Sequence, residues 1–159
     1  MANEHRFQND SVQRALEIFG DRWTFLILRE AFFGVRRYGE LARNLGLSRT
    51  ILSDRLRTLV AYGIFERRLY REQPQRHEYV LTAVGRDLYP AIVCVMQWGD
   101  RYLAGPEGPP LILRHSCGHD AAPRLTCGHC SAELRAEDVS PEPGPGAGVE
   151  QSASSSRAA

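Results

Sequence analysis

Residues 38–63, YGELARNLGLSRTILSDRLRTLVAYG, decide the fold of this chain. Their apolar residues recur at helical spacing on both sides of Gly46, which predicts a short helix over Tyr38–Leu45 and a longer one over Arg49–Ala61. Ser48 suits the N-cap of the second helix, and Gly63 suits its end. Two helices joined by a tight glycine-containing turn form a helix-turn-helix.

A hairpin is predicted directly after this stretch. Ile64–Tyr70 and His77–Leu81 have the composition of short strands, and the polar run Arg71–Arg76 between them predicts the hairpin tip. A helix-turn-helix followed by a hairpin has the element order of a winged helix-turn-helix.

Helices are predicted on both flanks of this module. Val12–Phe19 and Arg22–Phe33 precede it, and the second of these is apolar nearly all round, so we expect it to be buried. A longer helix is predicted from Thr82 to Ala104, kinked or split at Tyr89 by Pro90. The predicted fold class is mainly α with a small β-hairpin, with N- and C-terminal helices flanking the winged module.

The positive charge of the chain is concentrated in the winged module. The 159 residues carry a net charge of only +1, and every basic residue is an arginine. Residues 36–76 hold ten arginines and four acidic residues, so this segment carries +6 and the remainder −5. Such a basic block is typical of a face that binds a polyanion such as double-stranded DNA.

Other classes of protein are disfavoured by the sequence. The apolar runs are too short to span a bilayer, and the first residues lack the apolar segment of a signal peptide, so we expect a cytoplasmic protein with no membrane partner. No phosphate loop, dinucleotide fingerprint, nucleophile elbow or His-Glu-x-x-His helix is present. We therefore expect no enzyme and predict no catalytic residue.

The residues predicted to contact DNA are polar or basic and lie on the second helix of the motif, before its first helix and in the hairpin tip. A recognition helix must bury one face and present short polar side chains to the major groove near its N-terminus. Asp54 repels phosphate, so it is expected to pair with an arginine or to accept from cytosine. The predicted set is Arg37, Ser48, Arg49, Thr50, Ser53, Asp54, Arg57, Arg71, Gln73 and Arg76.

Three stretches of the chain resemble the HxlR-type family of bacterial winged helix regulators, which is related to the MarR-like regulators. They are the run from Tyr38 to Ile64, the segment Tyr79-Val80-Leu81-Thr82 with Gly85, and the upstream Gly20-Asp21-Arg22-Trp23. The resemblance covers roughly residues 11–103. It implies a homodimer, built through the N- and C-terminal helices, that binds an inverted-repeat operator, and a repressor is favoured. Some members sense oxidants through a cysteine before the first helix; here Ser11 stands at that position, and the sequence names no effector.

Four segments are predicted along the chain. They are a flexible N-terminus over residues 1–10, the winged and dimerising domain over 11–104, a linker with a small Cys/His segment over 105–139, and a disordered tail over 140–159.

The Cys/His segment could hold one structural zinc, the only candidate cofactor. The predicted ligands are Cys117, His119, Cys127 and Cys130, with His115 as the alternative histidine. Unligated or redox-active thiols are the rival interpretation. The alternative function is accordingly a zinc-binding or redox-active protein in which the helical domain is a scaffold or a protein-interaction module.

Overall fold

The structure is a computed structural model that describes residues 10–145. Residues 10–121 belong to one compact unit and residues 122–145 to a second, and each is described by itself. Most of the predicted flexible N-terminus and of the predicted disordered tail lies outside the described residues.

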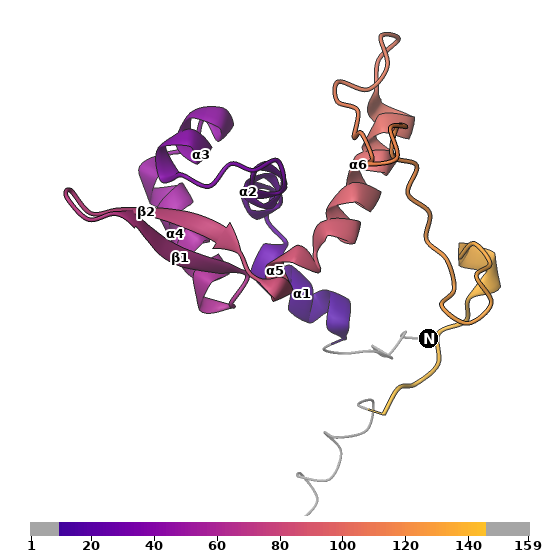
Figure 1. The fold of residues 1–159 in the computed structure, drawn as a ribbon. Helices are drawn as coiled ribbons and strands as arrows, with labels where there is room; N and C mark the ends of the chain where they lie inside the picture. The colour runs from indigo at the N-terminus through magenta and orange to yellow at the C-terminus, as the bar shows by residue number, and fades with distance from the viewer. Residues whose placement is uncertain (1–9, 146–159) are drawn as a thin grey trace, which may run out of the picture. The chain divides into compact units, whose positions relative to one another are not determined.

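The first unit has the predicted order of helices and a hairpin (Figure 1). Helices α1 and α2 precede the helix-turn-helix of α3 and α4, strands β1 and β2 follow, and α5 and α6 end the order. Their bounds are Ser11–Phe19 for α1, Arg22–Phe32 for α2, Tyr38–Leu45 for α3, Arg49–Ala61 for α4, Phe65–Arg71 for β1, Arg76–Leu81 for β2, Ala83–Arg86 for α5 and Tyr89–Leu103 for α6. The mainly helical winged helix-turn-helix fold is confirmed.

Short polar side chains begin the helices where the sequence places them. Asp21 accepts hydrogen bonds from the backbone at the start of α2, Ser48 does so for α4, and Thr82 for α5. Asp10, predicted to be frayed, instead accepts from the backbone of Gln13 and caps α1. Gly46 takes a left-handed conformation, with a φ of 62°, and turns the chain from α3 into α4.

The core of the first unit forms where α2, α3, α4 and β1 meet. It is made of buried aliphatic and aromatic side chains, namely Ile27, Leu28, Leu41, Leu47, Leu52, Leu56, Leu59, Ile64, Phe65 and Ile92. On α4 the core-facing side chains Leu52, Leu56 and Leu59 are fully buried, and Val60 is partly buried beside them. Helix α2 is less buried than predicted: Thr24, Ile27, Leu28 and Glu30 face the core, while Trp23 lies half-buried at its edge.

Strand β1 begins and ends one residue later than predicted, whereas β2 begins one residue earlier and ends at Leu81 as predicted. Strands β1 and β2 pair antiparallel, with Phe65 opposite Leu81 and Arg71 opposite Arg76, and a bulge lies between Leu69 and Arg71. Arg71 is therefore the last residue of β1 and Arg76 the first residue of β2, and neither belongs to the loop. A further backbone bridge joins Arg37 to Glu78, which the sequence did not indicate.

The helix predicted after Thr82 is divided into α5 and α6. The break falls just before Tyr89, and Pro90 lies in the first turn of α6, where its missing N–H group costs no helical hydrogen bond. Only Ile92 and Val93 of α6 are buried, so the rest of its apolar stripe is uncovered within one chain. Cys94 of α6 is exposed.

The C-terminal unit has little regular structure, namely a single turn of 3-10 helix over Ala136–Asp138. An isolated backbone bridge between Thr126 and Glu133 closes the loop that carries Cys127 and Cys130. Across residues 10–145, no helix is long and apolar enough to cross a membrane.

Candidate DNA interface

The recognition helix of the motif is α4, and it presents the predicted polar face to solvent. All six of its predicted DNA-contacting residues are exposed, namely Ser48, Arg49, Thr50, Ser53, Asp54 and Arg57. The opposite face is anchored in the core by three leucines. One buried and one polar face is the arrangement that a rigid helix entering a major groove requires.

A tyrosine hydroxyl joins the two helices of the motif at this face. The Tyr38 Oη atom donates to the backbone oxygen of Arg49 at 3.0 Å and lies 3.1 Å from Ser53 Oγ. The bond ties the first turn of α4 to the start of α3, beside two of the predicted base-contacting residues. Sequence reasoning assigned Tyr38 to the helix but missed this role, since the partners lie 11 and 15 residues away.

Asp54 forms ion pairs with two arginines, which is one of the two roles predicted for it. Its carboxylate oxygens lie 3.3 Å from Arg55 Nη2 and 3.5 Å from Arg57 Nη1. The pairing reduces the repulsion that a bare carboxylate would exert on phosphate and positions the Arg57 side chain on the exposed face.

The orientation of α4 is further held by a residue outside the motif. Arg55 Nη1 lies 3.4 Å from an Asp21 carboxylate oxygen, and the same carboxylate accepts from the backbone N–H groups of Trp23 and Thr24. Burial alone would raise the pKa of Asp21, but the Thr24 hydrogen bonds, the charge of Arg55 and the Trp23 N–H lower it below its ordinary value. One carboxylate thus caps α2 and binds the recognition helix.

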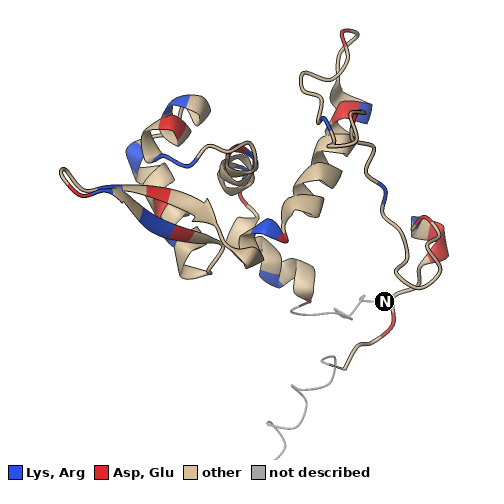
Figure 2. Ribbon diagram, in the orientation of Figure 1, with Lys and Arg blue, Asp and Glu red and all other residues tan. Residues whose placement is uncertain are grey.

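A polar hollow of about 440 Å³ lies between the start of α3 and the hairpin. Its walls are mainly basic and aromatic side chains, namely Arg37, Tyr38, Gly39, Glu40, Arg43, Tyr70, Arg76 and His77. In Figure 2 basic segments appear on the loop that leads into α3, on α3 and along the hairpin. The bridge between Arg37 and Glu78 brings the loop before α3 against the hairpin at this hollow.

The guanidinium groups around the hollow are only weakly neutralised. The Arg37 guanidinium stacks 4.9 Å from the Tyr70 ring centre, and its Nη1 atom lies 3.9 Å from Glu40. Arg43 and Arg76 make no ion pair within residues 10–145. The hollow therefore offers guanidinium donors to an anion such as a backbone phosphate. Arg43, Tyr70 and His77 were absent from the predicted set; the concentration of arginine was the only sequence signal for this site.

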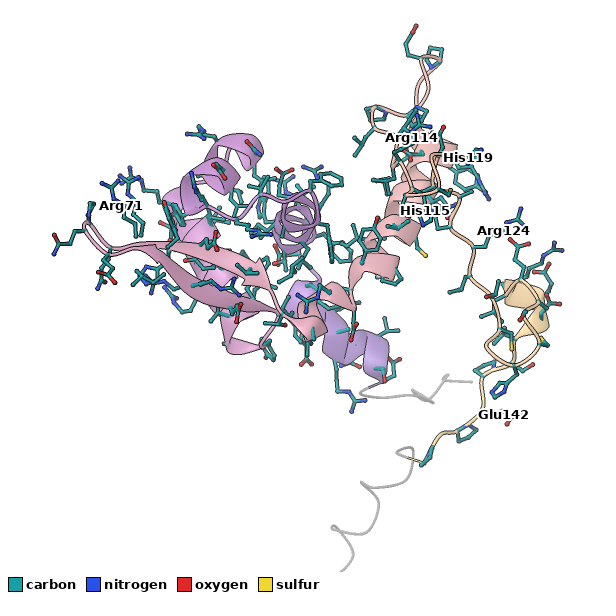
Figure 3. The ribbon with its side chains drawn as sticks, viewed as in Figure 1. Arg71, Arg114, His115, His119, Arg124 and Glu142 are labelled. Carbon is teal, nitrogen blue, oxygen red and sulfur yellow. The ribbon has the colours of Figure 1, made fainter. Side chains whose placement is uncertain are left out.

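The hairpin projects a basic end away from the helices. Figure 3 shows Arg71 at this free end, and its Nε atom donates to the backbone oxygen of Gln73 at 3.0 Å. Arg71, Gln73 and Arg76 are all exposed. The ten predicted residues thus fall on α4, the hairpin end and the hollow that joins the hairpin to α3.

The predicted zinc ligands occupy two separate turns. His115, Cys117 and His119 lie in a turn closed by a bridge between Arg114 and Asp120, in the first unit, whereas Cys127 and Cys130 belong to the second unit. Within residues 10–145 no three Cys, His, Asp or Glu side chains gather as a metal site. The four-residue ligand set stays a prediction.

A profile of the HxlR-like helix-turn-helix family matches residues 18–106. The chain belongs to the HxlR-like helix-turn-helix family. An HTH-type transcriptional regulator of Mycobacterium tuberculosis, described as uncharacterized, is 64% identical over 143 residues, which cover 89% of this chain and 90% of the relative. An alignment of that length necessarily continues into the segment after residue 106.

Solved structures agree with this family assignment. The crystal structure of PA1607, a candidate transcription factor, has a TM-score of 0.76 and 36% identity, covering 87% of this chain and 97% of the other. A MarR-family regulator from Porphyromonas gingivalis has a TM-score of 0.54 and 34% identity, covering 60% and 95%. This HxlR-like protein is therefore a transcriptional regulator with a helix-turn-helix DNA-binding domain, and it is not an enzyme.

Proposed function

We propose that this HxlR-like protein is a homodimeric repressor that binds an inverted-repeat operator through α4, the hairpin end and the hollow between α3 and the hairpin. The observation that carries the proposal is the exposed basic face whose recognition helix is fixed on both sides, by Tyr38 from α3 and by Asp21 from the start of α2. A helix held in this way can present its side chains to base edges in one orientation.

The contacts divide into two kinds. Arg49, Thr50, Ser53 and Arg57 lie on the exposed face of α4 and are proposed to reach base edges, with Ser48 and the helix N-terminus near a phosphate. Arg37, Arg71, Gln73 and Arg76 are proposed to contact the backbone or the minor groove beside them. Asp54 is proposed to orient Arg57.

The homodimer is supported by the uncovered apolar faces of the flanking helices. Val12 and Leu16 of α1 and Trp98, Tyr102 and Leu103 of α6 are more than half exposed. So much large apolar surface is costly for an isolated chain and typical of a subunit interface. A dimer with two-fold symmetry presents two α4 helices in opposite directions, which is why the operator is proposed to be an inverted repeat. Blocking of the promoter by such a dimer requires no further domain.

A gel-shift titration of the full chain against DNA from upstream of its own and neighbouring genes tests this function. We expect one fragment to bind specifically, with an affinity that falls steeply as salt is raised, because released counterions dominate the binding free energy. Equal affinity for all fragments, or none for any, would contradict an operator-binding protein.

Substitution of the two recognition-helix arginines tests the placement of the DNA face. Arg49→Ala and Arg57→Ala should each weaken specific binding by about 1–3 kcal/mol if the side chain makes a bidentate base contact. Arg76→Ala should weaken binding to every sequence and reduce the salt slope by about 1. Arg135→Ala removes the same charge in the C-terminal unit and serves as the control. If the three test variants bind DNA as tightly as the Arg135→Ala control, the DNA face lies elsewhere.

A further inference from the structure

The turn that carries Cys127 and Cys130 has no part in the proposed DNA contacts, and packing does not explain its cysteines. Cys130 is exposed and Cys127 half-exposed, and neither forms a disulfide. No residue from 105 to 145 is buried, and Leu125, with 61% of its surface exposed, is typical of the apolar side chains there. The segment therefore holds a defined backbone without a hydrophobic core.

That backbone is closed tightly around the first cysteine. The Cys127 N–H group donates to the Ala132 oxygen, and the Ser131 N–H group donates to the Cys127 oxygen, both at 2.8 Å. Ser131, directly after the second cysteine, has a φ of 60°, and it is the only non-glycine residue with a positive φ among residues 10–145. A non-glycine residue in this conformation is retained where its surroundings dictate the turn.

The closed turn also holds two cysteines at the spacing of a metal-binding knuckle. Gly128 and His129 alone separate Cys127 from Cys130, and the bridge between Thr126 and Glu133 joins the two ends of the turn. Paired cysteines at this spacing are typical ligands of zinc.

The turn at His115–His119 is built in a similar way within its own unit. A backbone bridge between Arg114 and Asp120 closes it, and Gly118, directly after Cys117, has a φ of 89°. The Cys117 N–H group donates to His115 Nδ1 at 3.3 Å, and Cys117 Sγ lies 3.7 Å from His119 Nδ1. Both turns are closed by a backbone bridge and expose a cysteine, which indicates that they serve the same function.

We propose that the Cys127–Cys130 turn is a thiolate knuckle that binds a zinc-class metal ion and thereby holds the coreless C-terminal segment in one conformation. A bound metal supplies the folding free energy that such a segment cannot obtain from apolar burial. Two thiolates supply two of the four ligands of a tetrahedral zinc ion. Cys94, on α6 and outside both turns, is the matched control cysteine.

Metal analysis of the full chain, purified without chelator, tests the proposal. We expect about one zinc ion per chain, lost in Cys127→Ser and in Cys130→Ser and retained in Cys94→Ser. Retained DNA binding shows that the winged domain of each variant is folded. Replacement of zinc by cobalt should give a thiolate-to-cobalt charge-transfer band in the parent and in Cys94→Ser, but neither knuckle variant should show the parent band.

Two results would overturn the knuckle. One is zinc retained undiminished in both Cys127→Ser and Cys130→Ser. The other is a parent protein that takes up no zinc and whose Cys127 and Cys130 thiols are instead oxidised to a disulfide by oxidised glutathione, which would assign a redox dithiol to the turn. Failure of DNA binding would overturn the proposed function and leave the metal result standing, so the two are separable.

Discussion

Asp21 is the residue on which two elements depend at once. Its carboxylate caps α2 through the Trp23 and Thr24 N–H groups and forms an ion pair with Arg55 of the recognition helix. The cap could be predicted from the sequence, because an aspartate directly before an apolar helix is a local signal. The ion pair could not, since Arg55 lies 34 residues away and is one of ten arginines between residues 36 and 76.

Acid should destabilise the protein through this residue. The pKa of Asp21 is lowered in the folded chain, so its contribution to stability is present above the pKa of the unfolded chain and is lost as the pH falls through the folded value. Asp21→Ala should reduce the free energy of unfolding at neutral pH by about 1–2 kcal/mol through the lost cap. Chemical denaturation at a series of pH values measures both effects.

Asp21→Asn provides the control for the acid effect. Asparagine can still cap α2 but carries no charge for Arg55, so this variant should be less destabilised at neutral pH than the alanine variant. Its stability should also decrease less steeply in acid than that of the parent. Parallel pH profiles for parent and variant would show that other carboxylates account for the acid sensitivity.

The Tyr38 hydroxyl should matter more for DNA affinity than for stability. Tyr38→Phe removes the hydrogen bond to the Arg49 backbone and the contact with Ser53 and leaves the ring in place. Loss of one such bond costs about 0.5–1.5 kcal/mol. We expect a DNA affinity several-fold weaker in the gel-shift titration and a free energy of unfolding lowered by no more than this amount. A fall in stability with unchanged affinity would show that the bond supports the fold alone.

Among the elements, local sequence signals predicted the helices and the hairpin well. Gly46, Ser48 and Thr82 lie at the turn and caps where their chemistry placed them. The hollow beside the hairpin could not be predicted, because it depends on the bridge between Arg37 and Glu78, whose residues lie in different elements. The periodicity of Val95 and Tyr102 shows an apolar stripe on α6 but not what covers it, so only the family resemblance assigned the C-terminal helix to a dimer interface.

Gly85 sets how closely α5 approaches the start of the hairpin. A Cβ atom built there would lie 2.2 Å from the backbone oxygen of Ile64, which cannot move aside as a flexible side chain could. Gly85→Ala should therefore destabilise the protein by about 1–3 kcal/mol. Gly39→Ala is the matched control, because Gly39 is a helical glycine of α3 with open space around its Cβ position. In thermal unfolding without DNA, Gly39→Ala should have a midpoint equal to or above that of the parent protein.

At the scale of the whole molecule, the proposed dimer rests on the flanking helices. The rings of Trp98 and Tyr102 contact each other on α6, with centres 5.4 Å apart and planes tilted by 47°, and each is more than half exposed. Trp98→Glu would place a charge in a subunit interface, where its desolvation is costly. We expect the parent to sediment as a dimer at micromolar concentration and the variant as a folded monomer with much weaker operator binding. A parent that sediments as a monomer would remove the dimer from the proposed function.

The bridge between Arg37 and Glu78 joins the segment before α3 to the second strand of the hairpin, and a 2.8 Å backbone bond from Tyr79 to Arg36 reinforces it. These two backbone connections should restrict how far the hairpin can move to follow a duplex of different groove width. We expect the DNA to deform to make up the difference. Operators with deformable pyrimidine–purine steps beside each half-site should be favoured, so base preference is expected at positions that no side chain of the protein contacts.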